Sequence, residues 1–372
     1  MKMNPTIGVL VPRSNIYPKL ARQFLDGIRL AFKNSNLTIE IIVEPIGFGE
    51  STSVISDKIQ KLELQNQVDF IIGYVGNFGV KSIQDLIIES EIPFLFTNIG
   101  GQMVNIKKSE FLHYHRYGLE QCNTQLGAYM AKYHGKKIAV ITSFYNSGYN
   151  HYNNFELGLK QYDGEIIHLQ INKDDLQEQD IYRFYESVND VSLDGILVLL
   201  NGKETQAFLQ VSNQLKLDKT LIFLLPEFSM EGWKESKVDF DNLFMVSASS
   251  SIQINELQNG GRNPDSKQKN VNQHTCFSLL GYECGLIVNY CIESMGHFGQ
   301  LNKFDLSANA GERILNWNSK LQGFETDISI YEYRQFKGLF TTNPMEHEIE
   351  KITETEINNN SVSGWLNPYM CI

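Results

Sequence analysis

Residues that could do chemistry are present throughout this chain, but their spacing matches no common catalytic or metal-binding motif. His113 and His115 alternate along a short strand-like stretch, so their side chains are expected to point the same way. Such a pair could bind a metal ion, but histidines at a surface or a crossover are commoner, and we expect no metal. The sequence has no H-E-x-x-H, C-x-x-C or G-x-S-x-G motif. We therefore expect no enzymatic activity.

The glycine-containing turns do not indicate a nucleotide cofactor. The turn after the first apolar run reads VPRSNIYP and lacks the three glycines of a dinucleotide-binding turn. Gly135, Lys136 and Lys137 lack the upstream glycine and the hydroxyl residue of a phosphate-binding loop. The pair Gly47 and Gly49 is weak evidence alone, so we expect no cofactor.

Composition narrows the classes of partner. The chain has 372 residues, of which 42% are hydrophobic and 20% are charged, and its net charge is −11. This length favours two lobes, each with its own core. The negative charge argues against nucleic acid and against anionic membrane surfaces. No apolar run approaches the length of a membrane-spanning helix, so direct insertion is not expected.

Three of the five cysteines lie on one expected helix, 275–295. Cys276, Cys284 and Cys291 are seven or eight residues apart, which separates their backbones by roughly 10 Å or more in a helix. A disulfide needs Cα atoms within about 7 Å, so none of the three should pair with another. We interpret them as small buried side chains on a core-facing stripe.

Short apolar runs alternate with segments of helical period, a pattern typical of parallel sheets covered by helices. Strands are expected at 6–11, 38–43, 68–72 and 93–97, with helices between them, including one over 51–64. A second series begins with a helix over 123–133 and continues through a strand near 243–247. The sequence thus predicts an α/β chain with two doubly wound Rossmann-like lobes.

Several segments, taken in order, resemble the type I periplasmic solute-binding proteins, in particular the leucine/isoleucine/valine-binding branch. The first strand, loop and helix read IGVLVPRSNIYPKLARQFLDGIRLAF, and a later stretch reads VDFIIGYVGNFGVKSIQDLIIESEIPFLFTN. The segments FYNSGYNHYNNFELGLKQYDGEII and FSLLGYECGLIVNYCIESMG are similar to that branch as well. The likeness spans roughly residues 5–300.

The resemblance implies a three-strand hinge, with crossings near 118–122, 249–253 and 330–340. One lobe should comprise 5–118 and 252–330, and the other 119–251 and 331–372. A small ligand, an amino acid or a related amide or carboxylate, would bind in the cleft between the lobes. The implied function is extracytoplasmic solute capture for an ABC transporter permease. No signal segment is visible, and the alternative is a cytoplasmic or receptor-type sensor of the same fold.

The resemblance also assigns site residues, each of which matches a position of the family's pattern. In the first lobe, Asn77, Phe78, Thr97 and Asn98 match two turns that hold a ligand carboxylate, although no serine or threonine occurs at 76–80. The remaining positions are aromatic side chains that cover the ligand and an acid that receives an ammonium group: Tyr17, Tyr145, Tyr149 and Glu227.

Each of these positions also has a structural interpretation. Asn77 could simply adopt a turn conformation, and Thr97 could only cap a helix. Tyr17 and Tyr145 could be ordinary loop residues, and Glu227 a solvated acid near a strand end. The sequence leaves these alternatives open.

Overall fold

The computed structural model describes residues 5–33, 38–100, 106–144, 151–173, 176–215, 220–236, 238, 243–245 and 275–293, together with five later strands between 303 and 344. The chain divides into two compact units, and each is described here by itself. Unit 1 holds the elements up to residue 118, the helix α11 (Cys276–Glu293) and the strands β11 to β13. Unit 2 holds the elements from α4 to β10 and the hairpin β14–β15.

Unit 1 is built on a sheet in the order β11-β12-β13-β5-β4-β3-β1-β2. The strands from β1 to β5 are parallel, β13 joins β5 in parallel, and β12 and β11 add antiparallel pairs. Their bounds are β1 Thr6–Val11, β2 Glu40–Pro45, β3 Phe70–Tyr74, β4 Phe94–Asn98, β5 Leu112–Arg116, β11 Lys303–Asp305, β12 Ile314–Asn318 and β13 Gly323–Thr326. Because β1, β3 and β4 are buried, mainly apolar runs between covering helices, they have the near-continuous hydrophobicity of parallel strands, whereas β5 (LHYHR) is buried but largely polar.

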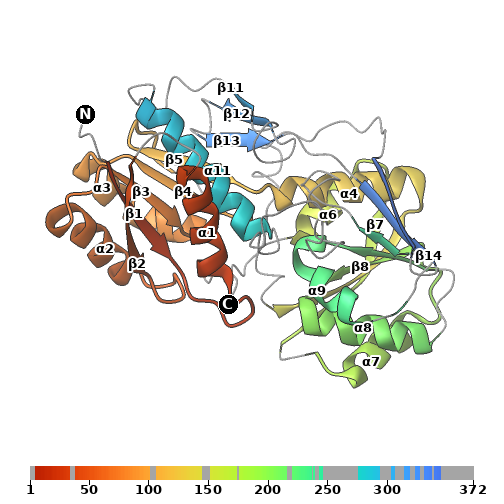
Figure 1. The fold of residues 1–372 in the computed structure, drawn as a ribbon. Coiled ribbons are helices and arrows are strands. Elements are labelled where there is room, and N and C mark those ends of the chain that lie inside the picture. Colours follow the sequence, from red (N-terminus) through yellow and green to blue (C-terminus); the bar gives the residue numbers. More distant parts are fainter. Residues whose placement is uncertain are drawn as a thin grey trace. The chain divides into compact units, whose positions relative to one another are not determined.

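Helices cover both faces of this sheet (Figure 1). One face carries α1 (Leu20–Lys33) and α11, and the other carries α2 (Thr52–Gln60), the π-helical turn η1 (Lys61–Gln65) and α3 (Asn77–Ser90). The pair α1 and α11 meets at glycines, because a Cβ on Gly27 would fall on the Ser278 carbonyl and one on Gly281 on the Phe24 carbonyl. The missing side chains let the two backbones touch.

Unit 2 repeats this plan with an all-parallel sheet in the order β10-β9-β8-β6-β7. Its strands are β6 Lys137–Ser143, β7 Glu165–Asn172, β8 Gly195–Leu199, β9 Leu221–Leu224 and β10 Leu243–Met245, and β14 (Tyr331–Phe336) of the hairpin with β15 (Leu339–Pro344) lies against β10. Its helices are α4 Leu119–Tyr133, α6 His151–Lys160, α7 Glu178–Val188, α8 Gly202–Gln214 and α9 Pro226–Ser236. Gly127 and Gly158 give α4 and α6 the same close contact as the glycines of unit 1.

The predicted α/β fold with two doubly wound lobes is confirmed, with local differences. The helix expected at 123–133 begins earlier, at Leu119, directly after Gly118, whose φ of +95° turns the chain out of the preceding strand. The helix expected over 51–64 changes to π-helical hydrogen bonding at Lys61. The crossing expected near 249–253 lies outside the described residues, and the segment expected to cross near 330–340 forms β14 and β15 of unit 2.

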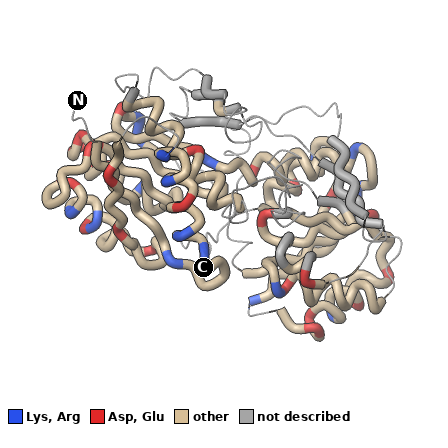
Figure 2. Tube along the Cα trace, viewed as in Figure 1, with Lys and Arg blue, Asp and Glu red and all other residues tan. Residues whose placement is uncertain are grey.

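The helix α11 carries the three cysteines expected on it; none of them forms a disulfide within the described residues, and Cys284 and Cys291 are buried. In the part of the chain that the structure describes, no helix has the length and apolar character needed to cross a membrane. Basic residues are interspersed with acidic ones along both units (Figure 2).

Candidate functional site

In each unit, the candidate site residues lie at the carboxyl edge of that unit's own parallel strands. In a parallel sheet the strands all end at one edge, and the helices that follow them begin there. In unit 1 this edge holds the turns after β1, β3, β4 and β5, and in unit 2 it holds the turns after β6, β7, β8 and β9. The polar groups at these helix starts decide what each edge can bind.

The start of α3 in unit 1 is suited to an anion. Its N-cap residue is Gly76, which offers no side chain to the helix, and its first turn contains no acid. Val80 is the first residue whose N–H donates within the helix, to the Gly76 carbonyl at 3.0 Å. The backbone N–H groups of Asn77, Phe78 and Gly79 thus precede the intrahelical hydrogen-bond ladder, in the first turn where the helix dipole gives a partial positive charge.

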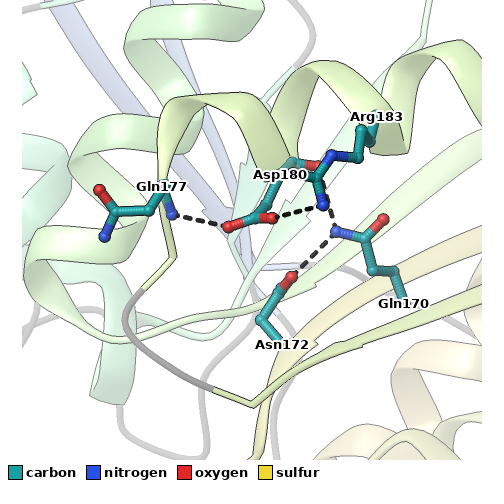
Figure 3. A network of polar contacts seen from close by, with 5 residues as sticks. All are labelled: Gln170, Asn172, Gln177, Asp180 and Arg183. Atoms are coloured by element: carbon teal, nitrogen blue, oxygen red, sulfur yellow. Dashed lines mark hydrogen bonds and ion pairs between the residues drawn. The ribbon is translucent and has the colours of Figure 1, made fainter.

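Other helices begin with acceptors from the chain itself. At α7, the Asp180 carboxylate accepts from the Gln177 N–H at 3.0 Å and pairs with Arg183 at 3.3 Å, within the network that Figure 3 shows. At α8, Glu204 accepts from the Asn201 N–H at 3.3 Å. These acids already supply the negative charge that a helix start favours. A bound carboxylate is therefore accommodated at α3 far better than at α7 or α8.

Asn98, at the end of β4, holds the α3 turn in place. Its Nδ2 donates to the Asn77 Oδ1 at 2.9 Å and to the Val75 carbonyl at 3.2 Å. Its Oδ1 accepts from the Gly100 N–H at 3.1 Å and from the Tyr114 hydroxyl at 3.2 Å. The Asn98 amide is thus engaged with the protein itself, and it links the two turns that the sequence analysis assigned to a carboxylate.

Thr97 lies on the opposite face of the sheet from Asn98. It is fully buried, and it lies beside the thiol of Cys284 on α11. Burial, with a further contribution from the neighbouring Glu283 carboxylate, raises the pKa of that thiol well above its usual range. The structure therefore brings Asn77, Phe78 and Asn98 together at the edge and places the Thr97 side chain beneath α11.

The two histidines of β5 have separate protein partners. The His115 Nε2 lies 2.8 Å from the Glu283 Oε2, and both side chains are fully buried. The His113 Nε2 lies 2.8 Å from the Glu110 carbonyl, and burial lowers the pKa of His113 to about 4. Among the residues that the structure describes, no group of three potential ligands is arranged to hold a metal ion.

Tyr17 is half-buried in the loop after β1. Its backbone N–H donates to the Ser14 Oγ at 2.9 Å, and its ring meets the Phe277 ring edge-to-face with centroids 5.2 Å apart. The Phe277 ring also contacts the Tyr74 ring, with centroids 6.1 Å apart, and the Tyr74 ring contacts the Phe24 ring, with centroids 5.5 Å apart. The Tyr17 ring is thus supported by an aromatic cluster of unit 1.

In unit 2, Glu227 lies in the first turn of α9, where it is half-buried. The next residue, Phe228, is buried, and its ring centroid lies 5.4 Å from that of His151 at the start of α6. Tyr145 and Tyr149 lie outside the described residues. The structure therefore locates Glu227 at the carboxyl edge of unit 2 and leaves both loop tyrosines as predictions.

Sequence reasoning missed two buried polar residues at the edge of unit 2, Asn123 and His151. The Asn123 Nδ2 lies 3.1 Å from the His151 Nδ1, and both side chains are fully buried. His151 shares its helical stripe with Phe155 and Leu159, four and eight residues later. A polar residue in register with such an apolar stripe was the available signal.

Comparison with known proteins gives the chain a family. The sequence profile described as "Periplasmic binding protein" matches residues 5–256. None of the curated proteins matches the chain significantly in sequence.

Several solved structures share the fold. An ABC transporter substrate-binding protein from Sphaerobacter thermophilus matches with a TM-score of 0.72 and 16% identity, over 92% of this chain and 97% of that one. A solute-binding protein of an ABC transporter from Rhodopseudomonas palustris, in complex with 3,4-dihydroxybenzoic acid, matches with a TM-score of 0.70 and 16% identity, over 95% of this chain and 99% of that one. A substrate-binding protein from Desulfitobacterium hafniense, in complex with Leu, matches with a TM-score of 0.65 and 13% identity, over 91% of this chain and 100% of that one.

At identities this low, the structural likeness shows the fold alone. The profile, however, covers well over half of the chain. The chain therefore belongs to the periplasmic binding protein family, whose members bind solutes and are not enzymes.

Proposed function

We propose that this protein captures a small carboxylate-bearing molecule and delivers it to the permease of an ABC transporter outside the cytoplasm. The observation that carries the proposal is the start of α3, which has neither an N-cap side chain nor an acid in its first turn. Neutral backbone donors with a helix dipole suit a single carboxylate. The family and the transporter proteins of similar fold support the transport role.

The ligand class follows from what the second unit adds. The similar structures from R. palustris and D. hafniense were solved with an aromatic acid and with Leu, which share a carboxylate and differ in an amine. Glu227 would pair with such an amine, since its carboxylate lies at a helix start of the carboxyl edge. We therefore propose an amino acid, or a related amide, with an apolar or aromatic side chain.

The aromatic residues complete this proposal. Tyr17, supported by Phe277, would cover the ligand from unit 1, and Tyr145 and Tyr149 would do so from unit 2. Asn98 and Thr97 would act by shaping the carboxylate turn rather than by exposing their own polar atoms. Asn77 and Phe78 would supply backbone N–H groups.

The test is calorimetry with leucine, phenylalanine and 4-hydroxybenzoate on the wild-type protein and on Glu227→Gln. Removing one partner of a desolvated charge pair costs about 2–5 kcal/mol, or roughly thirtyfold to several-thousandfold in affinity. We expect that loss for the amino acids and little change for the benzoate. Binding of the benzoate alone would contradict the amino-acid assignment, and binding of no carboxylate in a wider thermal-shift screen would contradict the function.

A further inference from the structure

The starts of three helices meet at the carboxyl edge of unit 2. The helices α6 and α9 follow the parallel strands β6 and β9, so both begin at that edge. The helix α4 ends near the start of β6, at the amino edge of the sheet, so the start of α4 lies at the carboxyl edge as well. His151 contacts the other two helix starts, through Asn123 of α4 and Phe228 of α9.

The hydrogen bonds of Asn123 determine which His151 nitrogen carries a proton. The Asn123 Nδ2 lies 2.7 Å from the Leu119 carbonyl oxygen, which accepts hydrogen bonds and cannot donate them. This contact fixes the orientation of the amide, so the atom that faces the His151 Nδ1 at 3.1 Å is the NH₂ group. An imidazole nitrogen that accepts a hydrogen bond carries no proton. In a neutral ring the hydrogen is then on Nε2.

The surroundings keep the ring neutral. His151 is fully buried, and burial lowers the pKa of His151 to about 3. Along the chain, the acidic residue nearest to Asn123 is the buried Glu120 on α4, and the acidic residue nearest to Phe228 is the half-buried Glu227 on α9. The ring therefore presents one fixed set of hydrogen-bonding groups at neutral pH.

We propose that His151 is a positioning residue of the binding site, held by Asn123 as the neutral Nε2–H tautomer and fixing the first turn of α9 that carries Glu227. The proposal rests on the proposed function of Glu227. Through Phe228, the neighbour of Glu227, a change in the His151 ring is transmitted to the position of that carboxylate. The role differs from simple core packing because it depends on the tautomer as well as on the ring's volume.

The tautomer is tested by NMR of the full chain labelled with ¹⁵N-histidine, with His151→Phe used to assign the signal. We expect a protonated Nε2 and an unprotonated Nδ1, unchanged between pH 5 and 8 as a pKa of about 3 requires. In Asn123→Asp the carboxylate accepts a hydrogen bond and cannot donate one, so the proton should move to Nδ1. A wild-type ring protonated at Nδ1, or one that titrates in this range, would overturn the proposal without any variant.

The positioning role is tested by the backbone amide signal of Phe228 and by leucine affinity. Asn123→Asp should shift that amide signal and weaken leucine binding at least fivefold. The matched control is Tyr185→Phe, which removes another buried hydrogen bond of unit 2, between Tyr185 and Ser212 at 2.6 Å, and joins α7 to α8. The control should leave the Phe228 signal in place and the affinity within twofold.

The two proposals fail in different ways. If the Phe228 amide signal does not respond to Asn123→Asp, His151 does not position α9, whatever the protein binds. If the tautomer and the amide signal respond as expected but wild-type protein binds no amino acid, the function proposed for Glu227 fails and the structural link stands.

Discussion

The two units share a packing plan and differ in the polar groups at their carboxyl edges. In both, a parallel sheet carries a pair of helices whose backbones touch at glycines: Gly27 and Gly281 in unit 1, Gly127 and Gly158 in unit 2. Each glycine lies against a backbone carbonyl of the partner helix. The scaffold is thus the same although the sequences are not, which shows how little of it depends on particular polar residues.

The start of α3, in contrast, differs in charge from the starts of three helices in unit 2. In unit 1, α3 begins with glycine and no acid, while in unit 2 α7, α8 and α9 carry Asp180, Glu204 and Glu227 in their first turns. Asp180 and Glu204 are bound to their own helix starts. This difference is the basis of the proposal that unit 1 binds an anionic group of the ligand and that unit 2 binds a donor group.

The first prediction tests the shared scaffold and has the largest expected effect on stability. A Cβ on Gly27 or Gly127 would overlap a carbonyl oxygen of the facing helix, and a backbone atom cannot rotate away. We expect Gly27→Ala and Gly127→Ala each to lower the free energy of unfolding by about 3 kcal/mol in urea titrations.

The sign of this effect is diagnostic. Alanine is the better helix former by about 1 kcal/mol, so without the close contact both substitutions would stabilise the protein. Lys203→Ala at an exposed position of α8 is the control and should change stability by less than about 0.5 kcal/mol. Stabilisation by either glycine substitution would show that the two helix pairs are not packed alike.

The second prediction compares the buried histidines of the units in acid. Burial lowers the pKa of His113 to about 4 and that of His151 to about 3, against a usual value near 6.5. Below pH 6.5 the unfolded chain takes up protons that the folded chain does not, so stability falls as the pH falls. Each histidine should contribute about 1.4 kcal/mol per pH unit until its folded pKa is reached.

The measurement is urea unfolding at pH 6.5, 5.5 and 4.5 for wild type, His113→Phe and His151→Phe. Carboxylates contribute to the pH dependence of all three proteins, so the comparison is made between their slopes. Each variant should have a shallower slope than wild type by about 1.4 kcal/mol per pH unit between pH 5.5 and 4.5. Equal slopes would show that the histidine is charged in the folded protein.

Much of the scaffold could be predicted from sequence because its signals are local. The buried strand Thr6–Val11 is a continuous apolar run, and its predicted bounds agree with the structure. The start of α4 was placed late because polar residues such as Glu120 and Asn123 are buried there, and buried polar residues have no periodic signal. The change to π-helical bonding at Lys61 is likewise invisible in the apolar pattern.

The site was less accessible to sequence reasoning because its contacts join distant segments. His115 and Glu283 are 168 residues apart, and only the folded sheet and α11 bring them together. The family resemblance assigned Asn77 and Asn98 to two separate turns, and the structure joins these two residues by a hydrogen bond at one edge. That the Asn98 amide is engaged by Gly100 and Tyr114, and that Thr97 faces α11, depends on register and side-chain direction.

The last prediction concerns a single substitution that places an acid at the start of α3 in unit 1, where the natural residue is Gly76. Gly76 has φ −67° and ψ 150°, an extended conformation that any L-residue adopts, so an N-cap side chain is compatible with the backbone. Gly76→Asp would give α3 an acidic start like those of α7, α8 and α9. We expect the cap to add about 0.5–1 kcal/mol to the free energy of unfolding, while affinity for leucine falls about tenfold because the new carboxylate competes with that of the ligand.

Gly76→Asn distinguishes the effect of the negative charge from the effect of occupying the N–H groups of α3, because the asparagine amide oxygen caps the same N–H groups without a negative charge. It should stabilise α3 similarly but weaken leucine binding less. Raising the ionic strength should recover part of the loss in the aspartate variant and little of the loss in the asparagine variant. If Gly76→Asp stabilises the protein and leaves affinity unchanged, the start of α3 does not bind the carboxylate, and the difference in charge between these helix starts concerns helix stability rather than ligand recognition.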